Sequence, residues 1–360
     1  MKQSHIVYGR LLNQGIAQTA FEAPHDVVRW LGAIQAQDYL GAKWALGLRS
    51  KGATVDVVEQ AFASGHILRT HLLRPTWHFV TPADIRWLLI LTAGRVHAAN
   101  AYMYRKLELD NAVFKRSEAA LVKALQGGQQ LTRDELRDVL RRADILTEGE
   151  LRMGYILMHA ELDGIICSGA RRGKQFTYTL LEERVAPART FTREQSLAEL
   201  ALRYFASRGP ATVQDFAKWS GLTVTDARNG LDAVKGELRN EVYERQSYWF
   251  AEPTTPLAKA NSPKAVLLSI YDEYISGYKD RSAIVSSEFA EELIALGNAL
   301  THVIVINGQI IGTWKRTFSS IAVMIETAPF RSFSSVEQRA LAVAMNRYAE
   351  FFGLPVNCVR

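Results

Sequence analysis

The sequence predicts an α+β protein in which one arrangement, helices followed by a β-hairpin, occurs three times before a strand-rich C-terminal region. Three observations carry this prediction. Apolar residues at helical spacing alternate with short β-branched and aromatic runs over residues 1–250. Threonines placed to cap helices, and glycine-containing turns, recur within these copies. From residue 265 onward most of the pattern is strand-like.

Composition narrows the class of protein before any motif does. A chain of 360 residues that is 48% hydrophobic is long enough for two to four domains with cores of their own. No run approaches the roughly 18 apolar residues of a membrane span, and residues 1–20 lack a signal-peptide core. We therefore expect a cytoplasmic protein without membrane contact. The net charge of +6 permits a polyanionic partner without requiring one.

Neither the cysteines nor the histidines predict a cofactor or a metal. Cys167 and Cys358 have no metal-ligand spacing and indicate no disulfide framework. The eight histidines are scattered, and the nearest to a group are His66, His71 and His78. Since no carboxylate or cysteine is spaced to complete a site, we interpret them as polar residues of the fold or of a site.

Residues 1–112 are predicted to form the first unit. Asp26 favours a helix start, and Thr54 is placed to cap a later helix. The segment 67–80 is β-branched and aromatic but is broken by Arg74-Pro75, which predicts two short strands and a turn. The expected elements are helices over 5–17, 25–34, 41–48 and 54–64, strands within 67–80, and a long helix from residue 81.

Two glutamines lie close together in the link between the second and third helices. Gln35 and Gln37 are bounded by Gly32 and Gly41, which favour a break in the helices. On a continuous helix, residues two apart point to nearly opposite sides, whereas in an extended or irregular link they face the same way. The pair could therefore serve one site, or could be solvated loop amides or hydrogen bonders at a helix end.

Residues 113–188 repeat the same arrangement. Ser117 is predicted to open a helix that ends near Leu125. Thr132, with Glu135 three residues later, forms a capping box at the start of the next helix. A third helix is expected over 148–162, followed by strands at 165–167 and 175–180.

The tip of this second hairpin is basic. Arg171, Arg172 and Lys174 lie within the segment 168–174, in which Gly169 and Gly173 flank the two arginines. Three cations on so short a loop repel one another unless an anion lies nearby, which favours phosphate contact. A solvated basic loop is the alternative.

Residues 189–254 contain the most complete copy. Thr212 is placed to cap a helix, Ser220-Gly221 makes a tight turn, and the following helix carries Arg228 on its outward side, beside Thr225 and Asn229. A helix over 194–208 precedes these elements, and strands are expected within 238–250. Helix, turn, second helix and hairpin at this spacing match the winged helix-turn-helix of DNA-binding proteins. Three such units in one chain are more specific than one.

After a Pro-rich link at 252–256, residues 255–360 are predicted to form a small mixed β domain, barrel-like in shape. Asn307-Gly308 is a strong signal for a two-residue hairpin. The expected elements are strands over 265–270, 302–306, 309–314 and 320–325 and helices over 287–296 and 335–351.

The segment 271–281 in this domain is polar and aromatic without periodicity, which predicts a structural corner or a site wall. Asp272 and Asp280 could be catalytic carboxylates. They could equally be structural carboxylates neutralised by Lys279 and Arg281.

Several motifs in this order resemble one family. They are Gln35-Ala36-Gln37, Leu73-Arg74-Pro75-Thr76-Trp77-His78-Phe79, the three winged-helix units, Tyr271-Asp272-Glu273-Tyr274, Tyr278-Lys279-Asp280-Arg281 and Gly312-Thr313-Trp314. Together, over essentially the whole chain, they resemble the AlkZ/YcaQ superfamily of bacterial winged-helix DNA glycosylases. The Gln-x-Gln pair resembles the AlkZ-like branch, since the YcaQ-like branch has Gln-x-Asp.

This resemblance implies three tandem winged helices in a C shape with a C-terminal β domain, and catalytic glutamines at Gln35 and Gln37. It also implies excision of alkylated purines, especially bulky N7-alkylguanines, and unhooking of interstrand crosslinks. The chemistry is compatible with amides, because an N7-alkylguanine is cationic and leaves without a general acid. Two side-chain carbonyls could orient the attacking water and face the oxocarbenium-like sugar.

Other residues are candidates for the site or its wall. Asp38 could act as a base, although alternation along an extended link would turn it away from the glutamines. His71, Trp77, His78 and Asp272 are further candidates. Trp77 could stack on a base, but a core position is the alternative, as it is for Trp44.

The expected partner is double-stranded DNA containing alkylated purines, contacted by a basic concave surface. Because a base tethered to the opposite strand cannot be extruded in the usual way, an open surface would meet a crosslink within the duplex. The candidate DNA-binding cations are Lys43, Arg69, Arg74, Arg171, Arg172, Lys174, Arg228, Lys279 and Arg281. Three units in one chain favour action as a monomer, and chromosomal DNA as substrate implies association with the nucleoid.

A transcriptional regulator without catalysis is the rival hypothesis, because winged helices serve that role most often. Against it stand the length of the chain, the three units and the position of Gln35 and Gln37 outside the recognition helix of the third unit.

Overall fold

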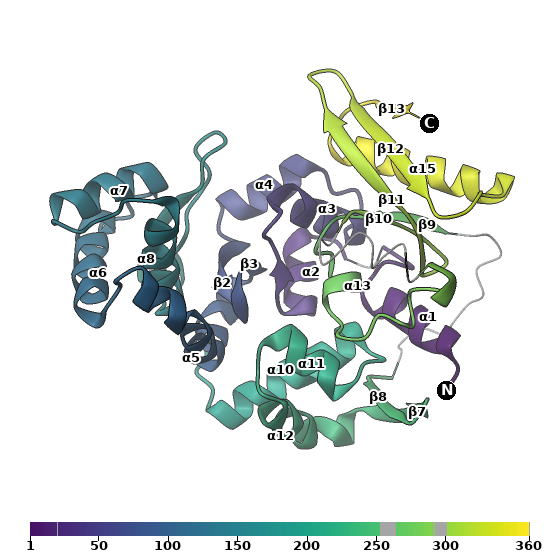
Figure 1. Cartoon of the computed structure of the whole chain (residues 1–360), viewed down its shortest axis with the longest axis horizontal. Coiled ribbons are helices and arrows are strands. Elements are labelled where there is room, and N and C mark those ends of the chain that lie inside the picture. Colours follow the sequence, from purple (N-terminus) through teal and green to yellow (C-terminus); the bar gives the residue numbers. More distant parts are fainter. Residues whose placement is uncertain (20, 253–263, 290, 292–300, 360) are drawn as a thin grey trace.

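The computed structural model describes residues 1–19, 21–252, 264–289, 291 and 301–359 (Figure 1). The fold is α+β, as the sequence predicts: helices dominate the first 250 residues, and a five-stranded sheet dominates the C-terminal part. Most of the expected Pro-rich link at 252–256 and much of the expected helix at 287–296 lie outside the described residues.

The first part of the chain surrounds a small antiparallel sheet with strand order β1-β3-β2. Thr54 caps its helix as predicted, accepting a hydrogen bond from the Val57 N–H. The glutamine link begins as a strand, in which Gln35 pairs with His78 of β3. The elements are α1 (Gln3–Asn13), α2 (Pro24–Leu31), β1 (Ile34–Gln35), α3 (Tyr39–Arg49), α4 (Val55–Ala63), β2 (Leu68–Leu72), β3 (Arg74–Val80) and α5 (Pro82–Lys106).

The second part forms a separate lobe at one end of the molecule, at the left of Figure 1. The capping box of Thr132 and Glu135 is confirmed. The predicted helix start at Ser117 is wrong: α6 begins at Asn111, because the Asp110 side chain caps it, and Ser117 lies inside the helix. The elements are α6 (Asn111–Leu125), β4 (Leu131–Thr132), α7 (Arg133–Arg142), α8 (Glu150–Leu162), β5 (Ile166–Ser168), β6 (Thr177–Leu180) and α9 (Leu181–Arg184).

The third part has the helix, turn, helix and hairpin order that the sequence predicts. Thr212 forms a capping box with Asp215, and Gly221 adopts a left-handed conformation, with φ of 71°, in the turn between two helices. The elements are α10 (Arg193–Arg208), α11 (Val213–Ser220), α12 (Val224–Val234), the 3-10 helix η1 (Lys235–Glu237), β7 (Arg239–Tyr243) and β8 (Gln246–Phe250).

The C-terminal part is a curled sheet with strand order β13-β12-β11-β10-β9. The Asn307-Gly308 hairpin is confirmed, with positive φ at both residues. The sequence missed β13, which pairs parallel to β12. The elements are β9 (Ala265–Leu268), α13 (Glu273–Ser276), the 3-10 helix η2 (Ser287–Phe289), β10 (Val303–Ile306), β11 (Gln309–Phe318), β12 (Val323–Pro329), α15 (Ser335–Phe351) and β13 (Val356–Val359).

The apolar cores join parts that are distant in sequence. One core runs from α1–α4 into the C-terminal sheet, where the buried ring of Trp44 lies 4.9 Å from Tyr348 and its Nε1 donates to the Leu267 carbonyl at 2.6 Å. A second core joins α5 and β2 to α10–α12, and a third fills the lobe around α6–α8. Trp44 is therefore a core residue, and the link that carries the glutamines lies among packed elements.

The division of the chain at residues 112, 188 and 254 stays a prediction.

None of the helices within the described ranges is long and apolar enough to cross a membrane.

Candidate active site

Strand β1 and the bend after it hold both glutamines against the start of β3. The Oε1 atom of Gln35 accepts a hydrogen bond from Arg74 Nη2 at 3.1 Å. The Oε1 atom of Gln37 accepts one from the Trp77 N–H at 3.4 Å. Both amide oxygens are therefore held by the four-residue stretch from Arg74 to Trp77. Because a carbonyl oxygen has two lone pairs, each retains one acceptor site for water.

The two side chains differ in access. Gln37 is exposed, whereas Gln35 is 9% exposed. Gln37 lies in the wall of a cavity of about 280 Å³ between the first part of the chain and the α6–α8 lobe. Gln35 does not line this cavity. The cavity is lined by Gln37, His71, Pro75, Trp77, Arg133, Leu151, Gly154, Tyr155, Leu157, Met158 and Tyr178.

His71 and Trp77, both named from the sequence as candidates for the site or its wall, line this cavity. Their rings lie 4.4 Å apart between centroids. The Nδ1 atom of His71 is hydrogen-bonded to Oε2 of Glu161 on α8, and both side chains are buried. This bond fixes the orientation of the imidazole. The sequence missed Glu161, whose only signal was an acidic residue near the end of an apolar helix.

His78 is not in the cavity wall, which corrects the sequence-based interpretation. Successive strand residues point to opposite faces, so His78 lies on the other side of β3 from Trp77. Its side chain is fully buried, and its Nδ1 atom is hydrogen-bonded to the Thr76 carbonyl at 2.9 Å. Burial, with a further contribution from the charge of Arg74, lowers its pKa well below the ordinary value. His78 is therefore neutral.

Asp38 also lies outside the cavity wall. Its Oδ2 atom accepts a hydrogen bond from Arg316 Nη2 at 3.0 Å, and its side chain is 25% exposed. The carboxylate thus ties the start of α3 to β11 of the C-terminal sheet. To act as a base, Asp38 would first have to break its ion pair with Arg316.

Asp272 is a structural carboxylate and not part of an accessible site. Its side chain is fully buried and accepts hydrogen bonds at 2.9 and 2.8 Å from the guanidinium of Arg49. It also caps α13 through the Tyr274 N–H. The sequence predicted a structural role as one alternative but named the wrong cations: Arg49, 223 residues away, neutralises Asp272.

The neighbouring Glu273 anchors the glutamine link. Its buried carboxylate accepts hydrogen bonds from the Gln35 N–H at 3.0 Å and from Trp219 Nε1 at 2.9 Å. Arg208 donates two more, at 3.1 and 2.7 Å, and also donates to the carbonyls of Leu31, at the end of α2, and Ala33, just before β1. Glu273 therefore joins the third part of the chain to the backbone of Gln35.

Two of the predicted DNA-binding cations converge on one carboxylate. Lys43 Nζ lies 2.6 Å and Arg171 Nη1 2.9 Å from Oε1 of Glu59 on α4. Lys43 is 3% exposed, and burial lowers its pKa. Lys43 is therefore not available to a duplex, which corrects that prediction. Arg171 joins the basic hairpin tip to α4.

Arg69 is a buried support of the glutamine link. Its guanidinium lies over the ring of Trp77 at 4.2 Å and that of Phe176 at 4.4 Å. Its Nε donates to the Ala36 carbonyl at 3.1 Å. Since Arg69 is only 7% exposed, the prediction of a phosphate contact does not fit its position.

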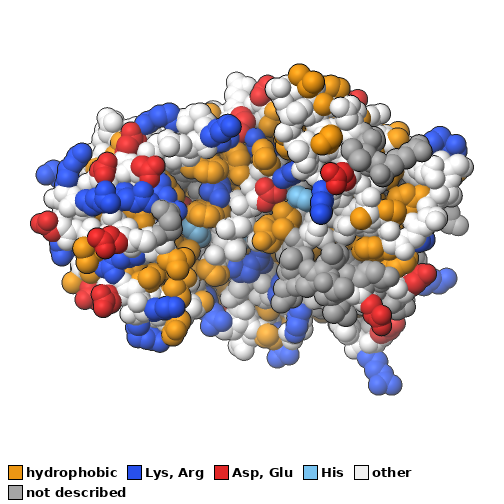
Figure 2. All heavy atoms as spheres, turned by 45° about the horizontal axis from the view of Figure 1, so that its top comes forward, with side chains coloured by type: hydrophobic (Ala, Val, Ile, Leu, Met, Phe, Trp, Pro, Cys, Tyr) orange, Lys and Arg blue, Asp and Glu red, His pale blue; other side chains and the backbone are white. Residues whose placement is uncertain are grey.

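The remaining cations differ in what holds them. Arg74 and Arg281 are half-buried, and Arg172 is exposed but paired with Glu135 at 2.7 Å. The charged groups of Lys174, Arg228 and Lys279 are exposed and have no hydrogen-bond or ion-pair partner within the described residues. Figure 2 shows Lys and Arg side chains gathered, with some acidic ones, over the left part of the molecule, where α6–α8 lie.

Comparison with known proteins gives this arrangement a family. The family model for "DNA glycosylase AlkZ-like" matches residues 28–351. The chain belongs to the AlkZ-like DNA glycosylase family. It is 25% identical over 376 aligned positions, covering 97% of each chain, to a Streptomyces sahachiroi protein named "Interstrand DNA cross-link repair glycosylase". The solved structure of "Streptomyces sahachiroi DNA glycosylase AlkZ" shares its fold, with a TM-score of 0.80 over all of both chains and 20% identity.

The family assignment confirms the resemblance that the motifs indicated. This AlkZ-like protein is an enzyme, a DNA glycosylase that hydrolyses N-glycosyl bonds. The rival hypothesis of a regulator without catalysis is thereby disfavoured.

Proposed function

We propose that this AlkZ-like glycosylase excises N7-alkylated purines, including bulky adducts and interstrand crosslinks, through a water positioned by Gln35 and Gln37. The observation that carries the proposal is the position of Gln37, exposed in the wall of a largely aromatic and apolar cavity. The name of the Streptomyces relative supports crosslinks as substrates.

The hydrogen bonds to the two amide oxygens support the proposal that these oxygens position a water. Arg74 donates a hydrogen bond to the oxygen of Gln35, and the N–H of Trp77 donates one to that of Gln37, which favours one orientation of each amide. Their remaining lone pairs can accept hydrogen bonds from one water placed beneath C1′ of the sugar. The same carbonyl dipoles stabilise the positive charge that develops on the sugar.

Two neutral amides suit a substrate that is already activated. An N7-alkylguanine is cationic and departs as a neutral base, so water placement and electrostatic stabilisation suffice. Unmodified guanine is a far poorer leaving group, and a site without a general acid leaves it intact. The weakness of the catalytic group is therefore a source of selectivity.

The architecture that we propose around this site is three winged helices in a C shape, acting as a monomer. The order of helices and hairpins in each of the three parts supports it. Such a surface would meet a crosslinked lesion within the duplex, which a fully extruding pocket cannot do. With chromosomal DNA as the proposed substrate, we propose that the enzyme acts in the cytoplasm, in association with the nucleoid.

The test is excision from a defined duplex. Purified protein is incubated with duplex DNA containing one N7-methylguanine, and abasic sites are revealed by alkaline cleavage. We expect cleavage at the lesion and none in the unmodified duplex. A panel with a bulky N7 adduct and an interstrand crosslink then ranks the substrates. Failure to excise any N7 adduct would contradict the proposal.

The exposed cations give a second prediction. Replacing Lys174 or Arg228 by alanine should weaken duplex binding and lower the slope of log affinity against log salt by roughly 0.9 for each phosphate that the side chain neutralises. The single-turnover excision rate at saturating protein should not change. Lys51→Ala, which removes an exposed cation paired with Glu22 outside the predicted surface, is the matched control. If the salt slopes of both variants equal that of the control, neither Lys174 nor Arg228 contacts a phosphate of the duplex.

A further inference from the structure

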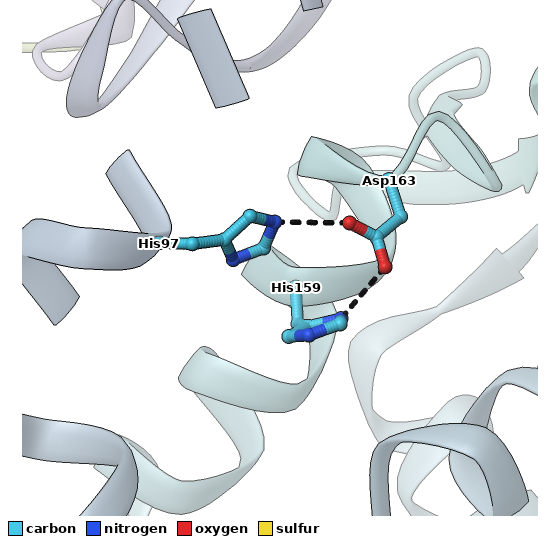
Figure 3. A group of neighbouring side chains, drawn as sticks. All are labelled: His97, His159 and Asp163. Carbon is cyan, nitrogen blue, oxygen red and sulfur yellow. Dashed lines mark hydrogen bonds and ion pairs between the residues drawn. The ribbon is translucent and has the colours of Figure 1, made fainter. Parts of the chain in front are cut away.

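A second polar cluster lies where α5 packs against α8, outside the residues that line the cavity (Figure 3). The Nε2 atom of His97 lies 2.9 Å from Oδ1 of Asp163, and Nδ1 of His159 lies 3.2 Å from Oδ2 of the same carboxylate. The potential ligand atoms all lie within 4.8 Å of one another. The proposed glycosylase chemistry uses none of the three.

We propose that His97, His159 and Asp163 form a binding site for a transition-metal ion of the Zn²⁺ class. Two imidazoles and a carboxylate are ligands that Zn²⁺ takes in proteins, with a fourth position left to water. Metal–ligand bonds of about 2 Å place neighbouring ligand atoms about 3.3 Å apart in a tetrahedral sphere. The two histidine–carboxylate separations, 2.9 and 3.2 Å, are close to that value. They end on different oxygens of Asp163, so the carboxylate must rotate toward both rings or bind through both oxygens when the ion enters.

The rings are held in place by neighbouring groups. The Nδ1 atom of His97 lies 2.9 Å from the hydroxyl of Tyr104, so an Nδ1–H donated to that oxygen leaves Nε2 as the ligand atom. The ring of Phe114 stacks on His159 at 3.6 Å between centroids and an interplanar angle of 19°. Ligands oriented in advance lose less entropy when the ion binds.

The exposure of the cluster also fits an ion. The side chains are partly exposed, at 24% for His97, 21% for His159 and 39% for Asp163, so an ion can reach them from solvent.

The sequence alone could not indicate this site. His97 lies on α5, while His159 and Asp163 lie at the end of α8, so only the packing of two helices brings the three together. The expectation that the histidines form no metal site considered only their spacing along the chain. A bound ion would join α5 to α8, the helix that supplies Tyr155 and Met158 to the cavity wall.

The rival explanation is a hydrogen-bonded clasp in which the two imidazoles donate protons to Asp163. In a metal site, the ion replaces those bridging protons, so binding releases protons and weakens on acidification. The clasp holds the same helices together but binds no ion.

The test is titration of the full-length chain, without an affinity tag and stripped with a chelator, with ZnCl₂ alone in a calorimeter. We expect one equivalent to bind with micromolar or tighter affinity and to raise the thermal unfolding midpoint by several degrees. His97→Gln and Asp163→Asn should each weaken binding at least tenfold and remove most of the thermal shift. His159→Gln is a third variant in case one of these fails to fold. His5→Gln, which removes an exposed histidine on α1, is the matched control and should bind as wild type does.

Two results would overturn the proposal. One is the absence of Zn²⁺ binding to the wild type, which would mean that the three side chains form only the hydrogen-bonded cluster. The other is equal stoichiometry and affinity in the wild type and the folded ligand variants, which means that Zn²⁺ binds elsewhere. Excision of N7-methylguanine is measured in parallel on the same protein. Failure of the metal proposal can then be distinguished from failure of the glycosylase proposal.

Discussion

The double substitution Gln35→Ala/Gln37→Ala is expected to abolish excision of N7-methylguanine while leaving duplex affinity nearly unchanged. The two amides are proposed to orient the attacking water, and loss of a group that activates or places the nucleophile typically costs about 10²–10⁴-fold in rate. Neither amide carries charge, so the electrostatic attraction to phosphate is retained. Single-turnover excision and equilibrium binding to the same duplex measure the two quantities separately.

We expect both substitutions to preserve the fold, although Gln35, at 9% exposure, loses buried side-chain atoms. The contact between Gln35 and Glu273 is made by the backbone N–H, which alanine retains. Arg74 loses the Gln35 oxygen but keeps a hydrogen bond to the Trp219 carbonyl at 2.5 Å. Gln37 is exposed, so alanine there leaves no cavity in the core. Unchanged thermal unfolding should accompany the loss of activity.

The single variants test whether the two amides act on one water. Groups that act as a unit are strongly non-additive, so each single variant should lose nearly as much as the double variant. Gln60→Ala, on the exposed side of α4, is the matched control and should excise at the wild-type rate. If the double variant excises as fast as the control, the glutamines do not catalyse the reaction. If only Gln37→Ala is inactive, Gln35 has a structural role. The low exposure of Gln35 makes this role the specific alternative to catalysis.

The elements that the sequence predicted correctly are those specified by neighbouring residues. A capping box needs two residues three positions apart, and both Thr132 with Glu135 and Thr212 with Asp215 form one. The Asn307-Gly308 turn needs only positive φ at two adjacent residues. The start of α6 was misplaced because Ser117 and Asp110 are both residues that can cap a helix, and it is Asp110 that caps this one.

Candidate residues for the site could be proposed from the sequence, but their arrangement in space could not be predicted from it. Gln35, Gln37, His71 and Trp77 lie within 43 positions, so they could be proposed as candidates from local sequence patterns. Lys43 was misassigned because its partner Glu59 lies on another helix, and a lysine's exposure depends on whether a carboxylate meets it on folding. Arg49 and Asp272 are 223 positions apart. Such pairs follow from tertiary packing, which composition and periodicity do not determine.

Removing the carboxylate of Glu273 is expected to destabilise the protein more than any other substitution considered. Glu273→Gln leaves Arg208 as a buried charge without a full partner, and breaking a buried ion pair from one side costs about 3–5 kcal/mol. It also weakens the acceptor of the Gln35 N–H, so β1 should lose its fixed position and excision should fall with stability. Chemical denaturation gives the first quantity, and excision at low temperature, where the variant stays folded, gives the second.

The pH dependence of stability tests whether the ionised carboxylate of Glu273 is the stabilising group. Burial alone would raise the pKa of Glu273, but the charge of Arg208, the Gln35 N–H and the hydrogen bonds from Arg208 outweigh it and hold the pKa below the ordinary 4.5. A depressed folded-state pKa means that the stabilisation is fully present above pH 4.5 and is lost as the pH falls through the folded-state value. The wild type should therefore lose this contribution on acidification, and Glu273→Gln should not.

A double-variant cycle separates the ion pair from the packing around it. Because Arg208→Gln and Glu273→Gln each leave one uncompensated charge and the double variant leaves none, the double variant should cost less than the sum of the singles. Glu22→Gln, which breaks an exposed pair with Lys51, is the control and should barely move the denaturation midpoint. Additive costs, or a Glu273→Gln protein as stable as that control, would mean that β1 is held by the neighbouring core and that the carboxylate does not position Gln35.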